Sequence, residues 1–392
     1  MSCIRLISIK YSERLGESKE WVLDNLPLSQ VNLLVGKNAT GKTRALNIIA
    51  SLAKLLTSTP RFMINFGSYD VLFDDDGVTL RYKLTVSSGN VTHEEYFIGD
   101  KRVLYRGPDG KGEIETHMAG AEPQMVRFSP PQSELAVVIR RDSLQHPYLE
   151  RLHLWSQATR HFTFGTPLGR DLLAMIIKGG PEADDRDTNQ AVGIFRKAQR
   201  EFGASFVDAV KKDMTQIGYA IDGLEIVAPE NIKLVLPANS LENPELSCIG
   251  IKEEGLDRVI DQTEISQGMF RALSMLIQVN YSQMAKRANC ILIDDIGEGL
   301  DFERSTQLIN VLRQKASESS FQLIMTTNDR FVMNNVPLNE WLVLQRQGGR
   351  IRVRNYENSK TLFDDFKFTG LSNFSLLEMD FLNDHESTEI GV

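Results

Sequence analysis

The sequence predicts an α/β fold in which helices cover a partly parallel sheet. An apolar run at 31–35 leads through a glycine-bearing loop into 43–56, where apolar residues recur at helical spacing. A second alternation of helix and strand comprises helix 269–286, strand 290–293, helix 303–316 and strand 322–326. Strands that alternate with helices of this length pair in parallel and are covered by those helices.

Between these two alternations the sequence pattern changes twice. From about 62 to 117, β-type residues alternate and are interrupted by turn signals, which predicts an antiparallel meander. From 142 to about 219 the periodicity is helical, with a charge-rich GGPEADDRDTN break at 179–189 that we expect to form an exposed loop. Strand-like segments return at 221–227 and 246–251.

We expect four parts along the chain. The first is an N-terminal lobe at 1–140 with the glycine-bearing loop and the meander, and the second is a mainly helical insertion at 141–245. A C-terminal lobe at 246–360 and a C-terminal tail at 361–392 follow. The pattern contains no repeat or heptad array, and it predicts no long coiled-coil arm.

Composition and charge limit the classes of protein that this chain can be. Hydrophobic residues make up 42% and charged residues 24% of 392 residues, which is typical of a folded globular protein. The formal charge of −8 argues against a surface that is basic all round, although a local basic groove stays compatible with it. Cys3, Cys248 and Cys290 lack paired spacing, and no stretch of about 18 apolar residues occurs. We expect a soluble cytoplasmic protein.

The loop at 36–43 (GKNATGKT) matches the pattern G-x-x-x-x-G-K-[ST] and lies between a predicted strand and a predicted helix. Its glycines let the backbone turn its N–H groups toward an anion, and the helix N-terminus adds the positive end of its dipole. The ammonium group of Lys42 would bind the β and γ phosphates through its positive charge, and the Thr43 hydroxyl would ligate magnesium. The sequence therefore predicts that ATP and Mg²⁺ bind here, in contact with Gly36, Asn38, Ala39, Thr40, Gly41, Lys42, Thr43 and Arg44.

A second candidate site follows the apolar strand at 290–293, which ends in Asp294 and Asp295. Such a pair can place one carboxylate, here Asp294, in the magnesium shell and the other beside the attacking water. A buried strand that ends in an acidic turn is also common without any catalytic role, so this pair alone does not assign a function.

The order of further motifs resembles the ABC-type ATPases of the RecF, SMC and OLD group. The segment 264–269 (EISQGM) precedes the long helix that leads to the acidic strand, where that family keeps its signature sequence, LSGGQ or LSDG. The resemblance implies that Ser266 and the N–H of Gly268 contact the γ phosphate bound by a second subunit. It therefore implies a homodimer that closes on ATP, with the possibility of a higher oligomer.

Three further positions acquire roles through the same resemblance. Asp301, in the segment GLD that follows the two carboxylates, corresponds to the family's D-loop and would pack across the dimer interface. Gln132 falls where a Q-loop glutamine would reach magnesium and the lytic water, although a plain surface position is the alternative. Asn328 stands where the family often has a switch histidine, and its amide can form hydrogen bonds but cannot carry a proton charge.

The general base also departs from the family pattern. The family usually has a glutamate where this chain has Asp295, whose carboxylate is one methylene shorter. A small misplacement of a reacting group can cost about 100-fold in rate, so we expect slow hydrolysis or a requirement for closure. Glu298 is an alternative base.

The resemblance covers roughly 1–60 and 245–357, and it extends to the stand-alone ATPases of prokaryotic anti-phage defence operons. It implies a nucleotide-driven switch or scaffold for a separately encoded effector such as a nuclease. A RecF-like or SMC-like ATPase of DNA repair or recombination is the main alternative. It would bind nucleic acid through the basic residues Lys197, Arg200, Lys211 and Lys212. These residues could equally form a solvated helix face. A transporter's nucleotide-binding subunit and a metabolic phosphotransferase fit the signature segment less well.

Overall fold

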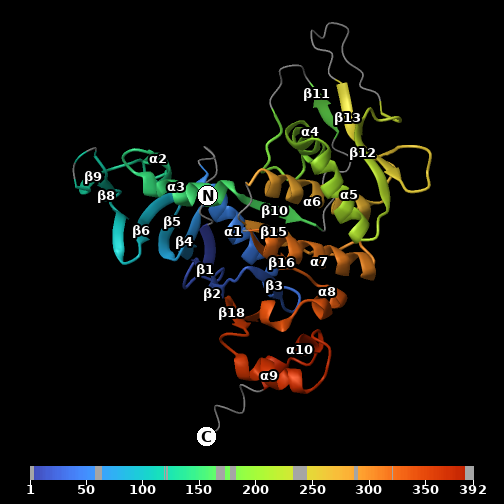
Figure 1. The fold of residues 1–392 in the computed structure, drawn as a ribbon. Coiled ribbons are helices and arrows are strands. Elements are labelled where there is room, and N and C mark those ends of the chain that lie inside the picture. The colour runs from blue at the N-terminus through green and yellow to red at the C-terminus, as the bar shows by residue number, and fades with distance from the viewer. Residues whose placement is uncertain are drawn as a thin grey trace. The chain divides into compact units, whose positions relative to one another are not determined.

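The computed structural model describes residues 4–57, 64–118, 120, 122–164, 173–176, 182–232, 245–286, 290–319 and 321–384. The chain divides into two compact units. Unit 1 comprises Met1–Thr159, Asn289–Leu292 and Ser320–Val392, and unit 2 comprises Arg160–Ala288 and Ile293–Ser319. Both ends of the chain therefore belong to unit 1 (Figure 1).

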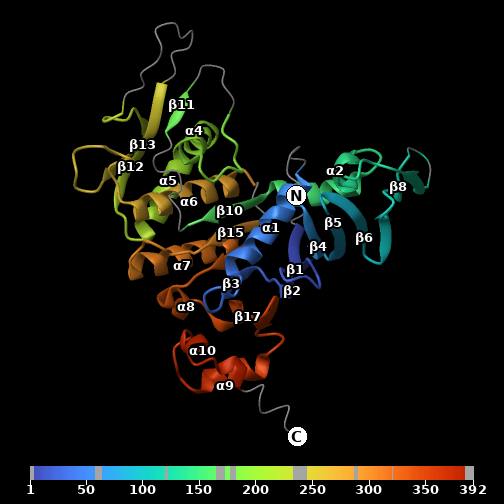
Figure 2. The ribbon, with the colours of Figure 1, turned by 180° about the vertical axis from the view of Figure 1, so that it is seen from behind.

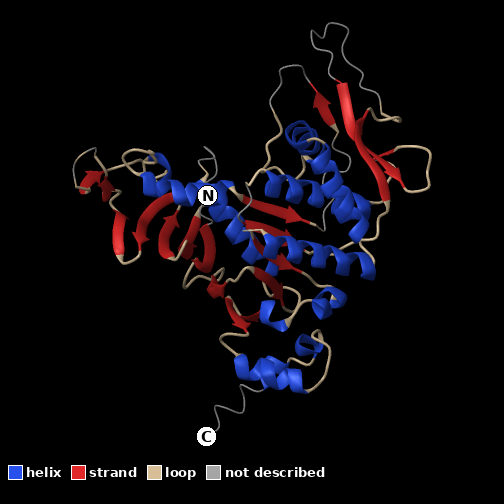
Figure 3. Ribbon diagram, viewed as in Figure 1, coloured by secondary structure: helices blue, strands red, loops and turns tan. Residues whose placement is uncertain are grey.

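Unit 1 contains one long mixed sheet. Its strands run in the order β16-β3-β17-β18-β2-β1-β4-β5-β6-β7-β8-β9, and the start of β15 adjoins β16. The strand bounds are β1 Ile4–Glu13, β2 Trp21–Pro27, β3 Val31–Val35, β4 Phe66–Asp75, β5 Val78–Ser87, β6 Asn90–Ile98, β7 Lys101–Arg106, β8 Gly112–Thr116, β9 Gln124–Phe128, β15 Cys290–Asp294, β16 Gln322–Thr326, β17 Trp341–Gln347 and β18 Arg350–Asn355. Figure 3 shows these strands in red.

The helices of unit 1 flank this sheet and follow its last strands. Their bounds are α1 Lys42–Leu56, α2 Ala136–Ile139, α3 Glu150–Gln157, α8 Arg330–Asn335, α9 Lys360–Phe368, α10 Ser375–Glu378 and α11 Phe381–Asp384, with short 3-10 turns at Pro147–Leu149 and Leu338–Glu340.

The centre of the unit 1 sheet is parallel. β3 pairs in parallel with β16 on one side and with β17 on the other, and Leu34 is aligned with both Thr326 and Leu342. β3 is almost wholly apolar and buried because both of its faces are covered. Leu46 and Ile49 of α1 lie in the same hydrophobic core as Leu34. The predicted α/β fold, with helices on a partly parallel sheet, is therefore confirmed.

The antiparallel part of the sheet runs from β4 to β9 and includes the predicted meander. It continues to Phe128, beyond the expected end at 117. Along β4, buried and half-buried residues alternate, because successive side chains point to opposite faces. Phe73 on the buried face meets Trp155 of α3 edge to face at 4.9 Å between ring centroids.

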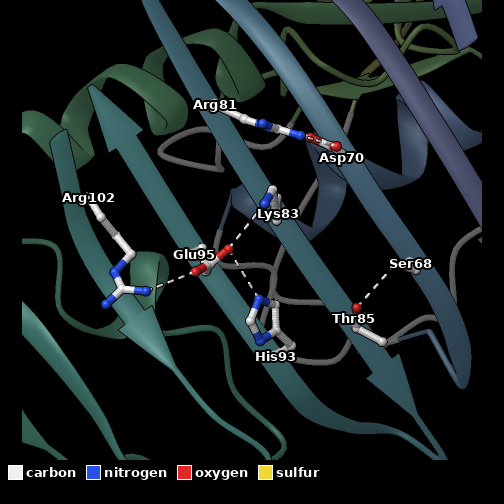
Figure 4. Close-up of polar contacts among 8 residues, drawn as sticks. All are labelled: Ser68, Asp70, Arg81, Lys83, Thr85, His93, Glu95 and Arg102. Carbon is white, nitrogen blue, oxygen red and sulfur yellow. Dashed lines mark hydrogen bonds and ion pairs between the residues drawn. The ribbon is translucent and has the colours of Figure 1, made fainter. Parts of the chain in front are cut away.

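The opposite face of the meander carries polar side chains whose charges alternate in sign (Figure 4). Glu95 on β6 accepts hydrogen bonds from Lys83 at 3.3 Å and Arg102 at 3.2 Å, and its Oε2 lies 3.3 Å from Nε2 of His93. Asp70 on β4 accepts two hydrogen bonds from Arg81 on β5. Each of these cations therefore has a carboxylate partner, so this part of the face is not a basic surface.

The region after residue 360, expected as a tail, contains helices α9 to α11. Phe363 and Phe366 of α9 and Leu376 of α10 are buried. The amide of Asn373 donates to the carbonyl of Val336 at 3.0 Å, and the Asn334 side chain accepts from the Phe374 N–H at 2.9 Å. Figures 1 and 2 both show α10 near α8, and these contacts make 360–384 a packed part of unit 1.

Unit 2 combines a small antiparallel sheet with helices. β13 pairs with β11, β12 and β14, and α6 packs against α4 and α5. The bounds are β11 Ala174–Ile176, α4 Ala191–Phe202, α5 Ala204–Gln216, β12 Ile221–Val227, β13 Glu245–Glu253, β14 Ile260–Asp261, α6 Gln267–Met284 and α7 Phe302–Glu318, with β10 Thr159–Thr163 beginning at the boundary.

A largely buried polar network joins three helices of unit 2, α5, α6 and α7. Lys315 of α7 lies 2.8 Å from the carboxylate of Asp213 of α5 and donates to the amide oxygen of Asn280 of α6 at 2.9 Å. Asn280 in turn donates to Asp213 at 2.6 Å. Since an unpartnered buried charge is costly, these three side chains specify how α5, α6 and α7 pack.

Candidate functional site

The loop between β3 and α1 has a compact turn structure. Both the N–H and the hydroxyl of Thr40 donate to the carbonyl of Lys37, at 3.3 and 2.8 Å. Ala39 adopts the left-handed conformation with φ 64°. Gly36 approaches β17 so closely that a Cβ at this position would lie 2.7 Å from the carbonyl oxygen of Leu344. The close approach explains why this position requires glycine.

The start of α1 combines an uncapped helix N-terminus with a buried lysine. Gly41 precedes the helix with φ 101°, and within α1 as described no side chain caps the first turn and no acidic residue lies in it. Lys42 is buried, and its Nζ donates to the carbonyl of Gly36 at 2.8 Å. Helix N-terminal amides together with a lysine ammonium form a common binding site for phosphate groups. This arrangement fits the phosphates of a nucleotide.

The other predicted contact residues of this loop lie at its surface. Asn38, Thr43 and Arg44 are exposed. The guanidinium of Arg44 lies 4.4 Å from the ring centroid of Trp21 and pairs with Glu13. Trp21 and Glu13 therefore hold the Arg44 side chain beside the first turn of α1.

A cavity of about 840 Å³ opens on the β17 side of the loop. It is lined by residues 36–40, by 343–348 of β17 and the following turn, and by Leu376, Leu377, Asp380 and Leu382. Asp380 lies 2.6 Å from Nζ of Lys37, and Arg346 donates to the carbonyl of Ala39 at 3.0 Å. Sequence reasoning missed both Arg346 and Asp380, because no motif marks them. The pairing of β17 with β3 brings Arg346 to the loop, and the packing of the C-terminal helices brings Asp380 there.

The predicted Q-loop and switch positions lie in unit 1. Asn328 is exposed two residues beyond Thr326, and since β16 is parallel to β3, the ends of these strands lie side by side where the loop begins. Gln132 is exposed and donates to the carbonyl of Pro108 in the turn between β7 and β8 at 3.4 Å. The backbone around Gln132 is held by the buried Arg106, which donates to Pro131 and Glu134.

The predicted signature segment begins α6 in unit 2. Ser266 is exposed and caps the helix, its side chain accepting from the N–H of Met269 at 3.2 Å. Gly268 is buried against the next loop, and a Cβ there would lie 2.5 Å from the carbonyl oxygen of Gly299.

The predicted D-loop is joined to this segment within unit 2. Asp301 caps α7 by accepting from the N–H of Arg304 at 2.9 Å, and this bond lowers the pKa of the Asp301 carboxyl. The Arg304 guanidinium lies 4.5 Å from the ring centroid of Tyr219, and burial raises the pKa of that phenol. Tyr219, which the sequence did not single out, also interacts with Ser266. The serine turn at 266–268 and the predicted D-loop at 299–301 are therefore linked through Tyr219 and Arg304.

The two carboxylates after β15 differ in environment. Asp294 is buried, and its backbone carbonyl accepts from the N–H of Phe164 at 2.9 Å. Asp295 is half-buried and has a left-handed backbone with φ 53°, a conformation that aspartate adopts more readily than most residues. Glu298 is exposed. No cluster of three or more His, Cys, Asp or Glu side chains suited to a metal occurs among the residues that the structure describes.

No protein-family model matches the chain, and no curated protein matches its sequence. Among solved structures, it is similar to an Smc head bound to the C-terminal winged-helix domain of ScpA, with 14% identity, a TM-score of 0.51, and coverage of 91% of this chain and 99% of that one. An SMC head domain from Thermotoga maritima gives 13% identity, a TM-score of 0.43, and coverage of 90% and 98%.

A third solved structure is an Smc head with an extended coiled coil, bound to the C-terminal domain of ScpA, from Pyrococcus furiosus. It gives 13% identity, a TM-score of 0.47, and coverage of 93% of this chain and 100% of that one. The likeness to the first Smc head shows that this chain has the fold of an SMC head domain. Among the described helices, none combines the length and apolar character needed to cross a membrane.

Proposed function

We propose that this protein is an ABC-class ATPase that dimerises around ATP and Mg²⁺. The observation that carries the proposal is the loop before α1, where an uncapped helix start and the buried Lys42 come together. Such an arrangement is suited to binding phosphate. The SMC head fold supports it, because the motif order resembles the group of ATPases that includes the SMC proteins.

The residues of the chain fit ATP and Mg²⁺ by their chemistry. The loop amides and Lys42 would hold the phosphates, while the Thr43 hydroxyl, Asp294 and Gln132 would hold the cation. Bound magnesium neutralises charge on the phosphate oxygens. Asp295 would accept the proton of the attacking water, and Asn328 would orient that water through a hydrogen bond.

The dimer would bring the exposed turn of one copy to the phosphate loop of another. Ser266, Glu298 and Asp301 are exposed in unit 2, while the N–H of Gly268 lies at the start of α6. Amides at a helix start attract phosphate, so the γ phosphate would join two copies. Binding energy from two nucleotides would then favour the closed state over the open state, as a switch requires.

We infer that this switch serves a separately encoded effector, such as a nuclease, in prokaryotic anti-phage defence in the cytoplasm. An SMC-like or RecF-like role on DNA is the second candidate, and the SMC head fold favours it equally. The basic residues of unit 2 argue against it. Lys197 and Arg200 both pair with Glu182, and Lys211 lies 4.0 Å from Asp208, so much of their charge is neutralised.

Nucleotide binding by the Lys42→Ala variant tests the proposal directly. We expect the wild-type protein to bind a fluorescent ATP analogue in the presence of Mg²⁺, and Lys42→Ala to bind it at least about tenfold more weakly. Lys54→Ala, in the last turn of the same helix, is the control and should bind like the wild type. Equal affinity in all three proteins would contradict the proposal.

A further inference from the structure

The side chain of Arg346 connects β17 to the phosphate loop. Its Nη1 donates to the carbonyl of Ala39 at 3.0 Å, and its Nε donates to the carbonyl of Gly348 at 2.8 Å. The planar guanidinium can make both bonds at once because its donors have a fixed geometry. The loop is therefore tied to the turn between β17 and β18.

The bond acts on one peptide group of the loop. The carbonyl of Ala39 and the N–H of Thr40 belong to the same planar unit and point in opposite directions. The carbonyl is held by Arg346, while the N–H points toward the loop and reaches the Lys37 carbonyl at 3.3 Å. A rotation of this peptide would break both bonds. Arg346 therefore fixes the direction in which the Thr40 N–H points.

The peptide lies beside an exposed residue of the loop. Ala39 has the left-handed φ of 64°, a strained conformation for a residue with a Cβ, and it is exposed. β17 continues beyond Val343, its last residue paired with β3, so residues 344–347 run alongside the loop. This extension of β17 brings Arg346 within reach of Ala39.

We propose that Arg346 is a positioning residue that holds the Ala39–Thr40 peptide in the orientation that binds phosphate. The expected change in nucleotide affinity rests on the proposed function. The effect of Arg346 on the conformation of the loop does not depend on nucleotide. A loop held in its binding conformation loses less conformational freedom when a ligand arrives, and it binds more tightly for that reason.

Two measurements on Arg346→Met and Arg346→Lys test the proposal. The control is Arg352→Met, which removes an exposed arginine from β18. Hydrogen exchange of the peptide covering 36–44, without nucleotide, should become several-fold faster in Arg346→Met and stay unchanged in Arg352→Met. Affinity for a fluorescent ATP analogue with Mg²⁺ should fall about tenfold in Arg346→Met and hardly at all in the control.

The lysine variant separates positioning from charge. Lysine keeps the positive charge but cannot bond both carbonyls in the same way, so Arg346→Lys should recover only part of the affinity and of the exchange protection. Full recovery with lysine, or exchange of 36–44 unchanged in Arg346→Met, would overturn the positioning role. If Arg346→Met exchanged faster at 36–44 but the wild-type protein bound no nucleotide, the proposed function would be overturned. The role of Arg346 in the loop would then stay intact.

Discussion

The guanidinium of Arg271, in the first turns of α6, donates a hydrogen bond to the backbone carbonyl of Glu298 at 3.0 Å. Arg271 is buried, and its Nη1 would lie 2.6 Å from a Cβ placed on Gly299. The serine turn at 266–268 and the loop 297–301 are thus held as one piece of unit 2. A partner surface that contacts one of these segments therefore meets it in a fixed position relative to the other.

Gly268→Ala should disturb this arrangement. The new Cβ would lie 2.5 Å from the Gly299 carbonyl and 3.1 Å from Leu300, so one of the two segments must shift. Overpacking of this kind costs about 1 to 3 kcal/mol, which exceeds the gain of about 1 kcal/mol from replacing glycine by alanine in a helix. Urea unfolding should show the loss in stability.

The neighbouring Gln267→Ala is the matched control for Gly268→Ala. Gln267 is exposed at the first position of α6, and its truncation should change the free energy of unfolding by less than about 0.5 kcal/mol. A Gly268→Ala protein as stable as the Gln267→Ala protein would show that these two segments are not in close contact.

Glu95→Gln should lower stability at neutral pH. Burial alone would raise the pKa of Glu95, but hydrogen bonds with His93, Lys83 and Arg102 outweigh it and lower that pKa. The folded state therefore favours the carboxylate, and its contribution is complete above the unfolded pKa of about 4.5 and is lost as pH falls through the folded pKa. We expect a difference of about 1 kcal/mol at pH 7 that vanishes in acid.

The measurement for Glu95 is urea unfolding between pH 7 and pH 3. Asp100→Asn, in the exposed turn between β6 and β7, removes the same charge and should leave stability unchanged at every pH. A Glu95→Gln deficit that is constant over this range would mean that packing, and not charge, explains it.

Asp380→Asn should strengthen nucleotide binding. The Asp380 carboxylate lies 2.6 Å from Nζ of Lys37 and beside the cavity next to the phosphate loop, so it repels an incoming polyphosphate and competes for Lys37. Asparagine has the same shape and tolerates the left-handed φ of 53° at this position. Because both side chains are exposed, we expect a gain of about two- to fivefold that shrinks at high salt.

Asp365→Asn is the charge-matched control for that experiment. Asp365 is exposed on α9 and is not among the residues that line the cavity, so its loss should leave affinity unchanged. If both variants gained equally, the overall charge of the protein would explain the effect. If Asp380→Asn bound more weakly, its carboxylate would support the site.

Local sequence patterns predicted the parallel core and the loop before α1 well. The strand, glycine loop and helix at 31–56 are consecutive in the chain, so spacing alone defines them. Ser266 and Asp301 were predicted through the resemblance to ABC-type ATPases, and the structure shows that each caps a helix. These signals are local, and the structure forms the expected helices and strands at those places.

The residues that sequence reasoning missed depend on contacts between distant segments. Arg346 reaches Ala39 across more than 300 residues, because β17 pairs with β3. Asp380 reaches Lys37 because the apolar residues of α9 and α10 pack into unit 1. Neither side chain belongs to a motif, and the composition of 361–392 alone gave no sign that residues as far as 382 line a cavity beside the loop.

Sedimentation velocity of the Asp295→Ala protein is the most direct test of the central claim. Without the proposed base, bound ATP should persist, and the protein should sediment as a dimer with ATP and Mg²⁺ but as a smaller species without nucleotide. Adding Ser266→Arg, which blocks the proposed γ-phosphate contact of the second copy, should abolish the dimer while ATP still binds each copy. The account would be contradicted if the protein bound ATP but sedimented as the same species with and without it. A dimer that still formed in the Ser266→Arg variant would contradict it as well.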